Sequence, residues 1–341
     1  MKLSVLVRLA LLTMLVITAI SCKEKKSALP NPSGSSNEIL IIMDKNEWES
    51  PVGDTVKAWF TQQQLGLPQP EPIFDVLNLP AANFERNVKA YRNIVYVKIS
   101  PSVDSARISF KESPWAKTQK YFQLEAPDAA AFLKLFEANK DMLMQVFLKA
   151  EQDRLIAIYK KNPDNKIAQL FKNKFHMDVN CSPEYNINKD SGDFVWISRE
   201  TNTDSRGIVF FQKEYTSVNQ LQYQAIIDVV DAELKAYIPG PLKGSYMALD
   251  TVAPIIADNY NYAETHYAVL MKGLWMVEND FMGGPFVLNV VLDQKNNRVI
   301  YMFGYVYAPE DKKRNAIRHV EAIMFSTDID YNEPETKTAT E

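Results

Sequence analysis

The sequence is poor in cysteine, which limits the covalent chemistry that the chain can carry. Only two cysteines occur in 341 residues, and Cys22 lies directly after an apolar N-terminal segment. If Cys22 is modified there, Cys181 has no partner in the chain, so a disulfide framework is excluded. Cys181 is then either a reactive thiol or, as is more common for a lone cysteine, a buried and inert side chain.

Motifs for metal and nucleotide binding are also missing. The three histidines, His176, His266 and His319, lie far apart, and neither HExxH nor CxxC occurs. The sequence has no GxSxG turn, no Walker loop and no GxGxxG. We therefore expect no metal and no cofactor, and we favour a protein without catalytic activity.

An excess of basic residues is absent as well. Removal of residues 1–21 takes away Lys2 and Arg8, so the 38 lysines and arginines fall to 36 against 42 acidic residues, a net charge of −6. This balance argues against nucleic acid as a partner, because no basic face is indicated.

Long apolar runs are scarce, and the one exception lies at the N-terminus. Lys2 and Arg8 precede an apolar stretch from Leu9 to Ile20. This stretch is too short to cross a hydrocarbon core of about 30 Å, for which about 20 residues are needed. Residues 1–21 are therefore typical of a secretory signal peptide.

The residues around Cys22 resemble a bacterial lipobox. Ala19 and Ser21 are small residues at positions −3 and −1, although the leucine that is usual at −3 is missing. The resemblance implies cleavage before Cys22 and acylation, for example with palmitate, of the thiol and of the new N-terminus. Several acyl chains give a stable membrane anchor where a single chain does not. The alternative is a signal peptide cut nearby, or an uncleaved anchor, with Cys22 unmodified.

The rest of the chain divides into a tether, a globular part and a tail. Residues 22–38 are rich in serine, proline and glycine without apolar periodicity, which predicts a flexible tether. Residues 39–326 are expected to be globular, either as one body or as two lobes at 39–176 and 192–326. Residues 327–341 are polar and predict a disordered tail.

Apolar periodicity predicts an α+β fold with largely antiparallel sheets packed against amphipathic helices. Strand patterns occur at 38–43, 73–79, 93–99, 106–111, 120–124, 193–198, 207–215, 266–278, 285–293 and 298–307. Helical patterns occur at 52–63, 127–161, 164–175, 217–237 and 310–325. In the first half, four strand patterns follow a single helix, which favours antiparallel pairing over repeated βαβ units.

Aromatic residues are concentrated in segment 259–307. It holds 10 of them, about twice the density of the whole chain. The candidate ligand-binding residues of this segment are Trp275, Tyr301, Phe303, Tyr305 and Tyr307. The last four share one face of the expected strand, and such a row can stack a sugar or a peptide. The alternative is a central strand that is buried on both faces.

Two carboxylates give the outline of a catalytic site. Glu278 and Asp280 are two residues apart, so on a strand they share a face and can raise one pKa by repulsion. Gly283 and Gly284 follow in a turn that can expose backbone amides. Paired carboxylates beside aromatic rings fit a glycosidase in outline. The alternative is a charged turn between two strands.

Four stretches of the chain resemble a known family. They are IIMDKNEWESPVGDTVKAWF (41–60), LGLPQPEPIFDV (65–76), GLWMVENDFMGGPF (273–286) and FGYVYAPEDKKRN (303–315). Together they are similar to an uncharacterised envelope lipoprotein family of Bacteroidota-type bacteria, known only as a domain of unknown function. The resemblance implies a lipid-anchored envelope protein and assigns no catalytic residues.

The residues that follow Cys22 bear on location. Lys23, Glu24, Lys25 and Lys26 differ from the acidic cluster of surface-displayed lipoproteins in such bacteria. We therefore expect the inner leaflet of the outer membrane, facing the periplasm. The function that we expect is non-catalytic binding or assembly, with an envelope protein or a cell-wall ligand as partner. The alternative is a hydrolase of envelope glycan or peptide that uses Glu278 and Asp280.

Overall fold

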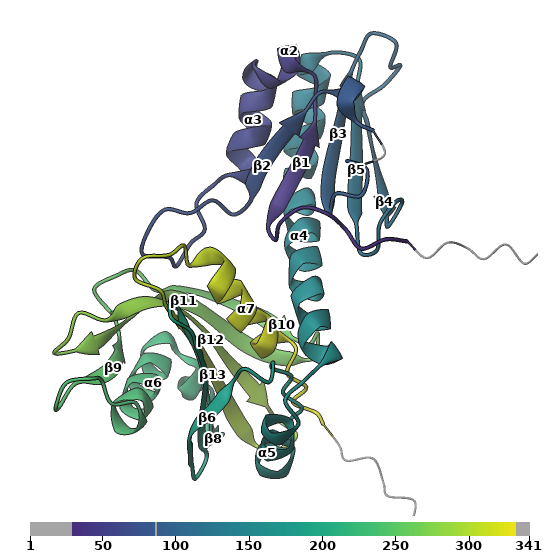
Figure 1. The fold of residues 1–341 in the computed structure, drawn as a ribbon. Coiled ribbons are helices and arrows are strands. Elements are labelled where there is room, and N and C mark those ends of the chain that lie inside the picture. Colours follow the sequence, from purple (N-terminus) through teal and green to yellow (C-terminus); the bar gives the residue numbers. More distant parts are fainter. Residues whose placement is uncertain (1–28, 86, 332–341) are drawn as a thin grey trace, which may run out of the picture.

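The computed structural model of the protein describes residues 29–85 and 87–331. It consists of two lobes, each built on its own β-sheet, with one long helix running between them (Figure 1). The N-terminal sheet has the strand order β2-β1-β3-β5-β4. The C-terminal sheet has the order β10-β11-β12-β13-β8-β7-β6, with β9 paired to β11. The predicted α+β class is confirmed.

Parallel pairing dominates the N-terminal sheet. Its strands are β1 (Glu38–Ile42), β2 (Asp75–Leu79), β3 (Asn93–Ile99), β4 (Arg107–Glu112) and β5 (Lys120–Ala126). β1 is parallel to both β2 and β3, and β3 is parallel to β5, whereas β4 is antiparallel to β5. The antiparallel pairing that we expected for this half is therefore wrong. Loops as well as helices make the crossovers here, so the scarcity of helices in the sequence did not indicate the pairing.

Helices cover one face of the N-terminal sheet. They are α2 (Lys45–Trp48), α3 (Pro51–Phe60) and the first half of α4 (Ala129–Lys161). α3 begins at Pro51 because Ser50 caps it and proline suits the first helical position. Phe60 of α3 and Phe147 of α4 pack edge-to-face, with ring centroids 6.0 Å apart. The opposite face is covered by the short η1 (Ala81–Asn83) and by loops.

Helix α4 belongs to both lobes. It begins at Ala129 because the Asp128 carboxylate accepts a hydrogen bond of 2.8 Å from the Ala131 N–H. Its first half packs in the N-terminal core, while Leu155 and Tyr159 pack in the C-terminal core. The lobe boundary therefore lies inside α4 and not at residue 176, where we expected it. The next helix, α5 (Asn165–Phe175), packs entirely in the C-terminal lobe.

The C-terminal sheet is antiparallel throughout its described strands. They are β6 (Asn186–Ser191), β7 (Phe194–Glu200), β8 (Ser205–Glu214), β9 (Tyr246–Leu249), β10 (Ile256–Tyr262), β11 (His266–Glu278), β12 (Gly283–Asp293) and β13 (Arg298–Tyr307). The sequence patterns predicted five of these strands within a few residues and missed β6, β9 and β10, which are short or exposed.

Helices lie on both faces of the C-terminal sheet (Figure 1). α5 and α7 (Arg314–Phe325) cover one face, and the other is covered by α6 (Tyr223–Tyr237) and the short η2 (Val218–Leu221). α7 lies close to β13 at Gly304, where a Cβ atom would be 2.1 Å from Val320 Cγ1. The sheet is therefore buried on both sides.

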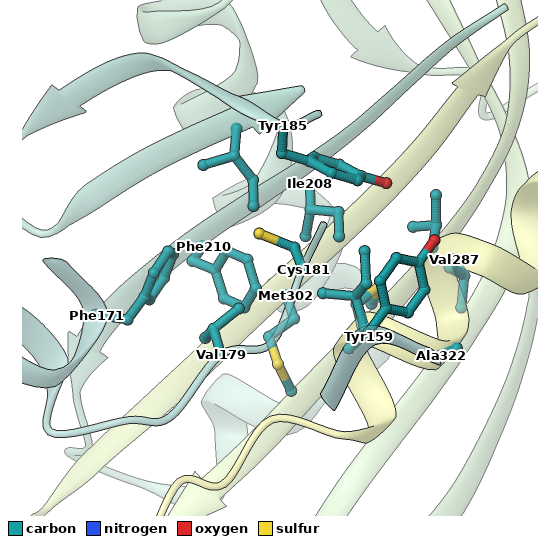
Figure 2. Close-up of a cluster of buried hydrophobic side chains, with 14 of the residues drawn as sticks. Tyr159, Phe171, Val179, Cys181, Tyr185, Ile208, Phe210, Val287, Met302 and Ala322 are labelled. Carbon is teal, nitrogen blue, oxygen red and sulfur yellow. The ribbon is translucent and has the colours of Figure 1, made fainter. Parts of the chain in front are cut away.

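Cys181 lies in the core of the C-terminal lobe, surrounded by side chains that include Val179, Ile208 and Met302 (Figure 2). It is fully buried. Burial, together with the nearby Asp164 carboxylate, raises the pKa of the Cys181 thiol to about 12. The prediction that this cysteine is buried is confirmed.

Both ends of the described chain pack against the lobes. The Ser33 N–H donates to the Ala90 carbonyl over 2.8 Å, and Asn37 is buried. The Asp178 and Asp328 backbones form a bridge, and Ile329 is buried. A flexible tether and a disordered tail are therefore wrong for residues 30–38 and 327–331, because backbone hydrogen bonds fasten both segments. Residues 1–28, with Cys22, and residues 332–341 lie outside the described part. Within the described part, none of the helices has the length and hydropathy of a membrane span.

Candidate functional site

The aromatic row of β13 is divided between core and cavity. Tyr301 and Phe303 are fully buried under α6. The Tyr301 ring stacks on Phe211 of β8 with centroids 4.6 Å apart. These two members of the candidate set are therefore core residues, as the buried-strand alternative predicted.

The other end of the row lines a cavity of about 390 Å³. We call this cavity the aromatic pocket. Its lining includes Trp275, Tyr305 and Tyr307 of the candidate set, together with Trp196 of β7 and residues 238–241, which follow α6. The pocket therefore lies where the cover provided by α6 ends. Two methionines, Met247 and Met282, also line it.

Hydrogen bonds hold both indoles of the aromatic pocket in place. The Trp196 Nε1–H donates to the Tyr305 hydroxyl over 3.0 Å, and the Trp275 Nε1–H donates to the Val306 carbonyl over 3.1 Å. Trp275 and Tyr305 are 2% and 4% exposed, so they form the inner wall. Trp196 and Tyr307 are half-buried and present accessible ring surface.

The close packing of Tyr305 depends on a glycine. Gly207 of β8 is paired with Tyr305 of β13, and a Cβ atom at Gly207 would lie 2.1 Å from the tyrosine ring. The ring therefore lies over the β8 backbone, which leaves the Trp275 ring room to pack edge-to-face on it, with centroids 5.3 Å apart. Such contacts fix ring orientation in advance of binding.

The β7–β8 turn adds a polar rim to the aromatic pocket. Glu200 is exposed there, and its Oε1 accepts hydrogen bonds of 2.8 Å from the hydroxyls of Ser198 and Ser205. Asp204 is buried, which alone would raise its pKa, but hydrogen bonds from Thr201 and Arg206 outweigh this and lower the pKa of Asp204. The rim therefore carries carboxylates and hydroxyl groups beside the accessible rings.

Sequence reasoning missed Trp196 and the rim. Trp196 belongs to a predicted strand, but its approach to Tyr305 requires the order β13-β8-β7, which joins segments about a hundred residues apart. The rim residues form a polar turn of the kind that connects any two strands. Strand alternation places Trp196 on the same face as the apolar Phe194, but the sequence did not show which strand lies beside it.

The candidate catalytic pair lies on the turn between β11 and β12, beside the aromatic pocket but not in its lining. Glu278 ends β11, and the Asp280 carboxylate accepts a hydrogen bond of 2.5 Å from the Phe281 N–H. Asn279 has a φ of 66°, as is common in tight turns, and Phe281 is fully exposed. Neither carboxylate lines the aromatic pocket or the larger cavity between the lobes. The arrangement is that of the charged-turn alternative.

Metal ligands do not converge in the part of the chain that the structure describes: residues 29–85 and 87–331 contain no group of three or more His, Cys, Asp or Glu side chains placed to hold an ion.

Two family models match the chain, and they divide it at the end of α4. Residues 32–160 match "Domain of unknown function (DUF8532)", and residues 164–326 match "Domain of unknown function (DUF4837)". The resemblance to an uncharacterised family is therefore confirmed, while an origin in Bacteroidota-type bacteria stays a prediction. Neither description indicates a catalytic function.

Other comparisons add little. No curated protein matches the sequence. Among solved structures, the Saccharomyces cerevisiae Ran-binding protein Mog1p matches with 6% identity and a TM-score of 0.29, over 45% of this chain and 90% of that chain. A point variant of protein Mog1 gives the same values. A TM-score this low supports no argument about fold or function.

Proposed function

We propose that this chain is a lipid-anchored protein of the bacterial envelope that binds cell-wall glycan in its aromatic pocket without altering it. The anchor rests on the sequence of residues 1–27, where a short apolar segment ends in small residues before Cys22. The basic residues after Cys22 favour the inner leaflet of the outer membrane, facing the periplasm. The glycan rests on the geometry of the aromatic pocket.

One observation carries the glycan proposal: accessible aromatic rings and hydrogen-bonding groups line the same cavity. Trp196 and Tyr307 offer ring surface, and Glu200 and the threonines of residues 201–203 offer acceptors and hydroxyls. A sugar ring has an apolar face that packs on aromatic rings and hydroxyl groups that donate to carboxylates. The volume of about 390 Å³ lies in the usual range of ligand sites.

Binding without catalysis fits the way in which the rim carboxylates are held. Asp204 accepts hydrogen bonds from Thr201 and ion-pairs with Arg206 and Arg199, and its pKa is lowered. An acid that remains ionised and fully paired is a poor proton donor. Two serine hydroxyls donate to Glu200 Oε1, which fixes the carboxylate and leaves Oε2 to accept from a ligand. These groups are therefore suited to orienting a ligand.

The anchor is tested with labelled palmitate in growing cells. We expect label on the purified protein and none on Cys22→Ser, because the thiol is the site of acylation. A mature protein that still begins at Met1, or that carries no label, would contradict the lipid anchor and with it the proposed location at the membrane.

Glycan binding is tested by calorimetric titration of disaccharide-peptide fragments of peptidoglycan into the chain from residue 22 onwards, carrying Cys22→Ser. Trp196→Ala and Tyr307→Ala should each weaken binding at least tenfold, since each removes accessible ring surface. The matched control is Glu278→Gln, which changes a carboxylate outside the aromatic pocket and should leave the affinity unchanged. Equal affinity for Trp196→Ala and the parent would refute the proposal.

A further inference from the structure

A second cavity, of about 560 Å³, lies between the two lobes. We call it the interlobe cleft. Its walls come from α4 and α7, which lie beside each other where α4 leaves the N-terminal lobe (Figure 1). Residues 62–65, which follow α3, and strands β10 and β11 complete it. Cavities between domains are frequent ligand sites, and this volume lies in their usual range.

The α4 wall of the interlobe cleft alternates apolar and amide side chains. Gln145, Leu148, Gln152 and Leu155 recur at spacings of three and four residues and so share one side of the helix. Within residues 29–85 and 87–331, the amides of Gln145 and Gln152 have no hydrogen-bond partner. Phe325 of α7 adds apolar surface from the other side.

Arg318 of α7 is a buried cation on the wall of this cleft. It is 8% exposed. Its guanidinium donates to Asn37 Oδ1, to Gln64 Oε1 over 3.1 Å and to the Ile73 carbonyl over 3.0 Å, all of which are neutral acceptors. No described carboxylate forms an ion pair with it, although the more distant carboxylates of Glu321, Glu151 and Asp75 favour its charged form. Burial lowers the pKa of Arg318 to about 10, so the group remains charged at neutral pH.

Other cations of the region have an acidic partner. Arg314, one turn earlier on α7, is paired with Asp75 over 2.7 Å and does not line the cleft. Lys272 lines the cleft but is paired with Glu321 over 2.6 Å. A buried charge without a counter-charge is costly, and an anion that enters beside Arg318 would relieve that cost.

We propose that the interlobe cleft binds an amphipathic anion, with its carboxylate or phosphate head group on Arg318 and its apolar body against Leu148, Leu155 and Phe325. The three protein acceptors leave the Nε–H and one Nη1–H of the guanidinium to donate, and the oxygens of either head group accept such charge-assisted hydrogen bonds. The free amides of the α4 wall supply further donors to the same oxygens. This site is separate from the aromatic pocket and does not depend on the glycan proposal.

The test uses three probes of equal chain length: decanoate, decyl phosphate and neutral decanol. They are titrated into the chain from residue 22 onwards, carrying Cys22→Ser, which retains both lobes in full. At least one anionic probe should bind ten or more times more tightly than decanol, and the stronger of the two identifies the preferred head group. Decanol binding as tightly as both anions would overturn the proposal.

Two arginine variants separate charge from lobe docking. Arg318→Gln should reduce the affinity for the anion at least tenfold and leave that for decanol nearly unchanged. Arg314→Gln removes another contact between α7 and the N-terminal lobe but retains the cation of the cleft, so it should bind the anion like the parent. Anion binding unchanged by Arg318→Gln, or lost equally in both variants, would refute a role for the Arg318 charge.

Should Arg318→Gln fail to fold, as judged by circular dichroism, Leu148→Glu provides the same test. It places a carboxylate on the cleft wall and should weaken anion binding at least tenfold by repulsion, with a smaller effect on decanol. Unchanged anion affinity in a folded Leu148→Glu would overturn the assignment of the cleft.

Discussion

The faces of the two sheets are covered in different ways. In the N-terminal lobe, helices cover one face and loops cover the other, where rings such as Phe84 and Trp115 complete the packing. In the C-terminal lobe, helices cover both faces. On the face that α6 covers, a central strand of this sheet can meet a ligand only where the helix ends. This explains why the aromatic row of β13 becomes accessible at Tyr307, beyond the end of α6, and not at Tyr301 or Phe303.

The largest effect is expected from the doubly covered sheet. Phe303→Ala should lower the free energy of unfolding by about 3–5 kcal/mol, because it opens a cavity in a fully buried core. Trp115→Ala, on the loop-covered face, should lower it by about 1–2 kcal/mol, since that ring is already partly exposed. Urea unfolding followed by circular dichroism measures both. Equal losses in the free energy of unfolding would show that packing under loops stabilises a sheet as much as packing under helices.

The junction of the lobes should give the next largest effect. Glu71 is 5% exposed, and its carboxylate accepts hydrogen bonds from the Lys313 N–H over 2.6 Å and the Arg314 N–H over 3.0 Å, so it caps α7 from the other lobe. Glu71→Ala should lower the free energy of unfolding by about 2–3 kcal/mol, because two buried N–H groups lose their acceptor. Glu71→Gln retains one acceptor and should lose less. The exposed Glu49→Ala serves as control and should change stability by less than about 0.5 kcal/mol. The junction has no such role if Glu71→Ala is as stable as that control.

A smaller effect should appear on acidification of the C-terminal lobe. Burial, together with the nearby Arg206 and Arg199, lowers the pKa of His319 from 6.5 to about 4, and its ring is hydrogen-bonded to the Tyr159 hydroxyl over 2.8 Å. The unfolded chain therefore binds a proton before the folded one does. The stability that neutral His319 contributes is complete above about pH 6.5 and falls as the pH drops toward 4. From pH 7 to pH 5 the loss should be about 2 kcal/mol.

Urea midpoints of the parent and of His319→Gln at pH 7 and pH 5 check this loss. The variant should be the less sensitive of the two to the change in pH. If both lose the same stability, His319 does not remain neutral in the folded protein.

Local features of the fold were readable from the sequence, while pairings between distant segments were not. Helix α4 was predicted at 127–161 and begins two residues later, because Asp128 and Pro163 mark its ends. β3, β11 and β13 have the predicted bounds. Apolar periodicity and helix caps depend only on residues that are close in the sequence, so they can be predicted from the sequence alone. The parallel order of the N-terminal sheet and the division of α4 between two lobes depend on contacts between residues far apart in the sequence.

In the candidate site too, local features were predicted from the sequence and contacts between distant segments were not. Trp275, Tyr305 and Tyr307 were found because their segment is rich in aromatic residues. Tyr301 and Phe303 were included because the sequence does not show which part of β13 is covered by α6. Trp196 and the rim were missed because β7 and β8 reach Tyr305 only through the sheet order. Glu278 and Asp280 have the spacing of a catalytic pair, but neither carboxylate lines the aromatic pocket or the interlobe cleft.

The central claim, that the aromatic pocket binds glycan, is tested most directly by the indole N–H resonances of the five tryptophans during titration with peptidoglycan fragments. Trp196, whose indole is fixed by Tyr305 at the pocket, should shift strongly. Trp59, which donates to the Lys140 carbonyl in the other lobe, should not move. A spectrum in which Trp196 stays still at saturating fragment, or in which Trp59 shifts as much, would contradict the account.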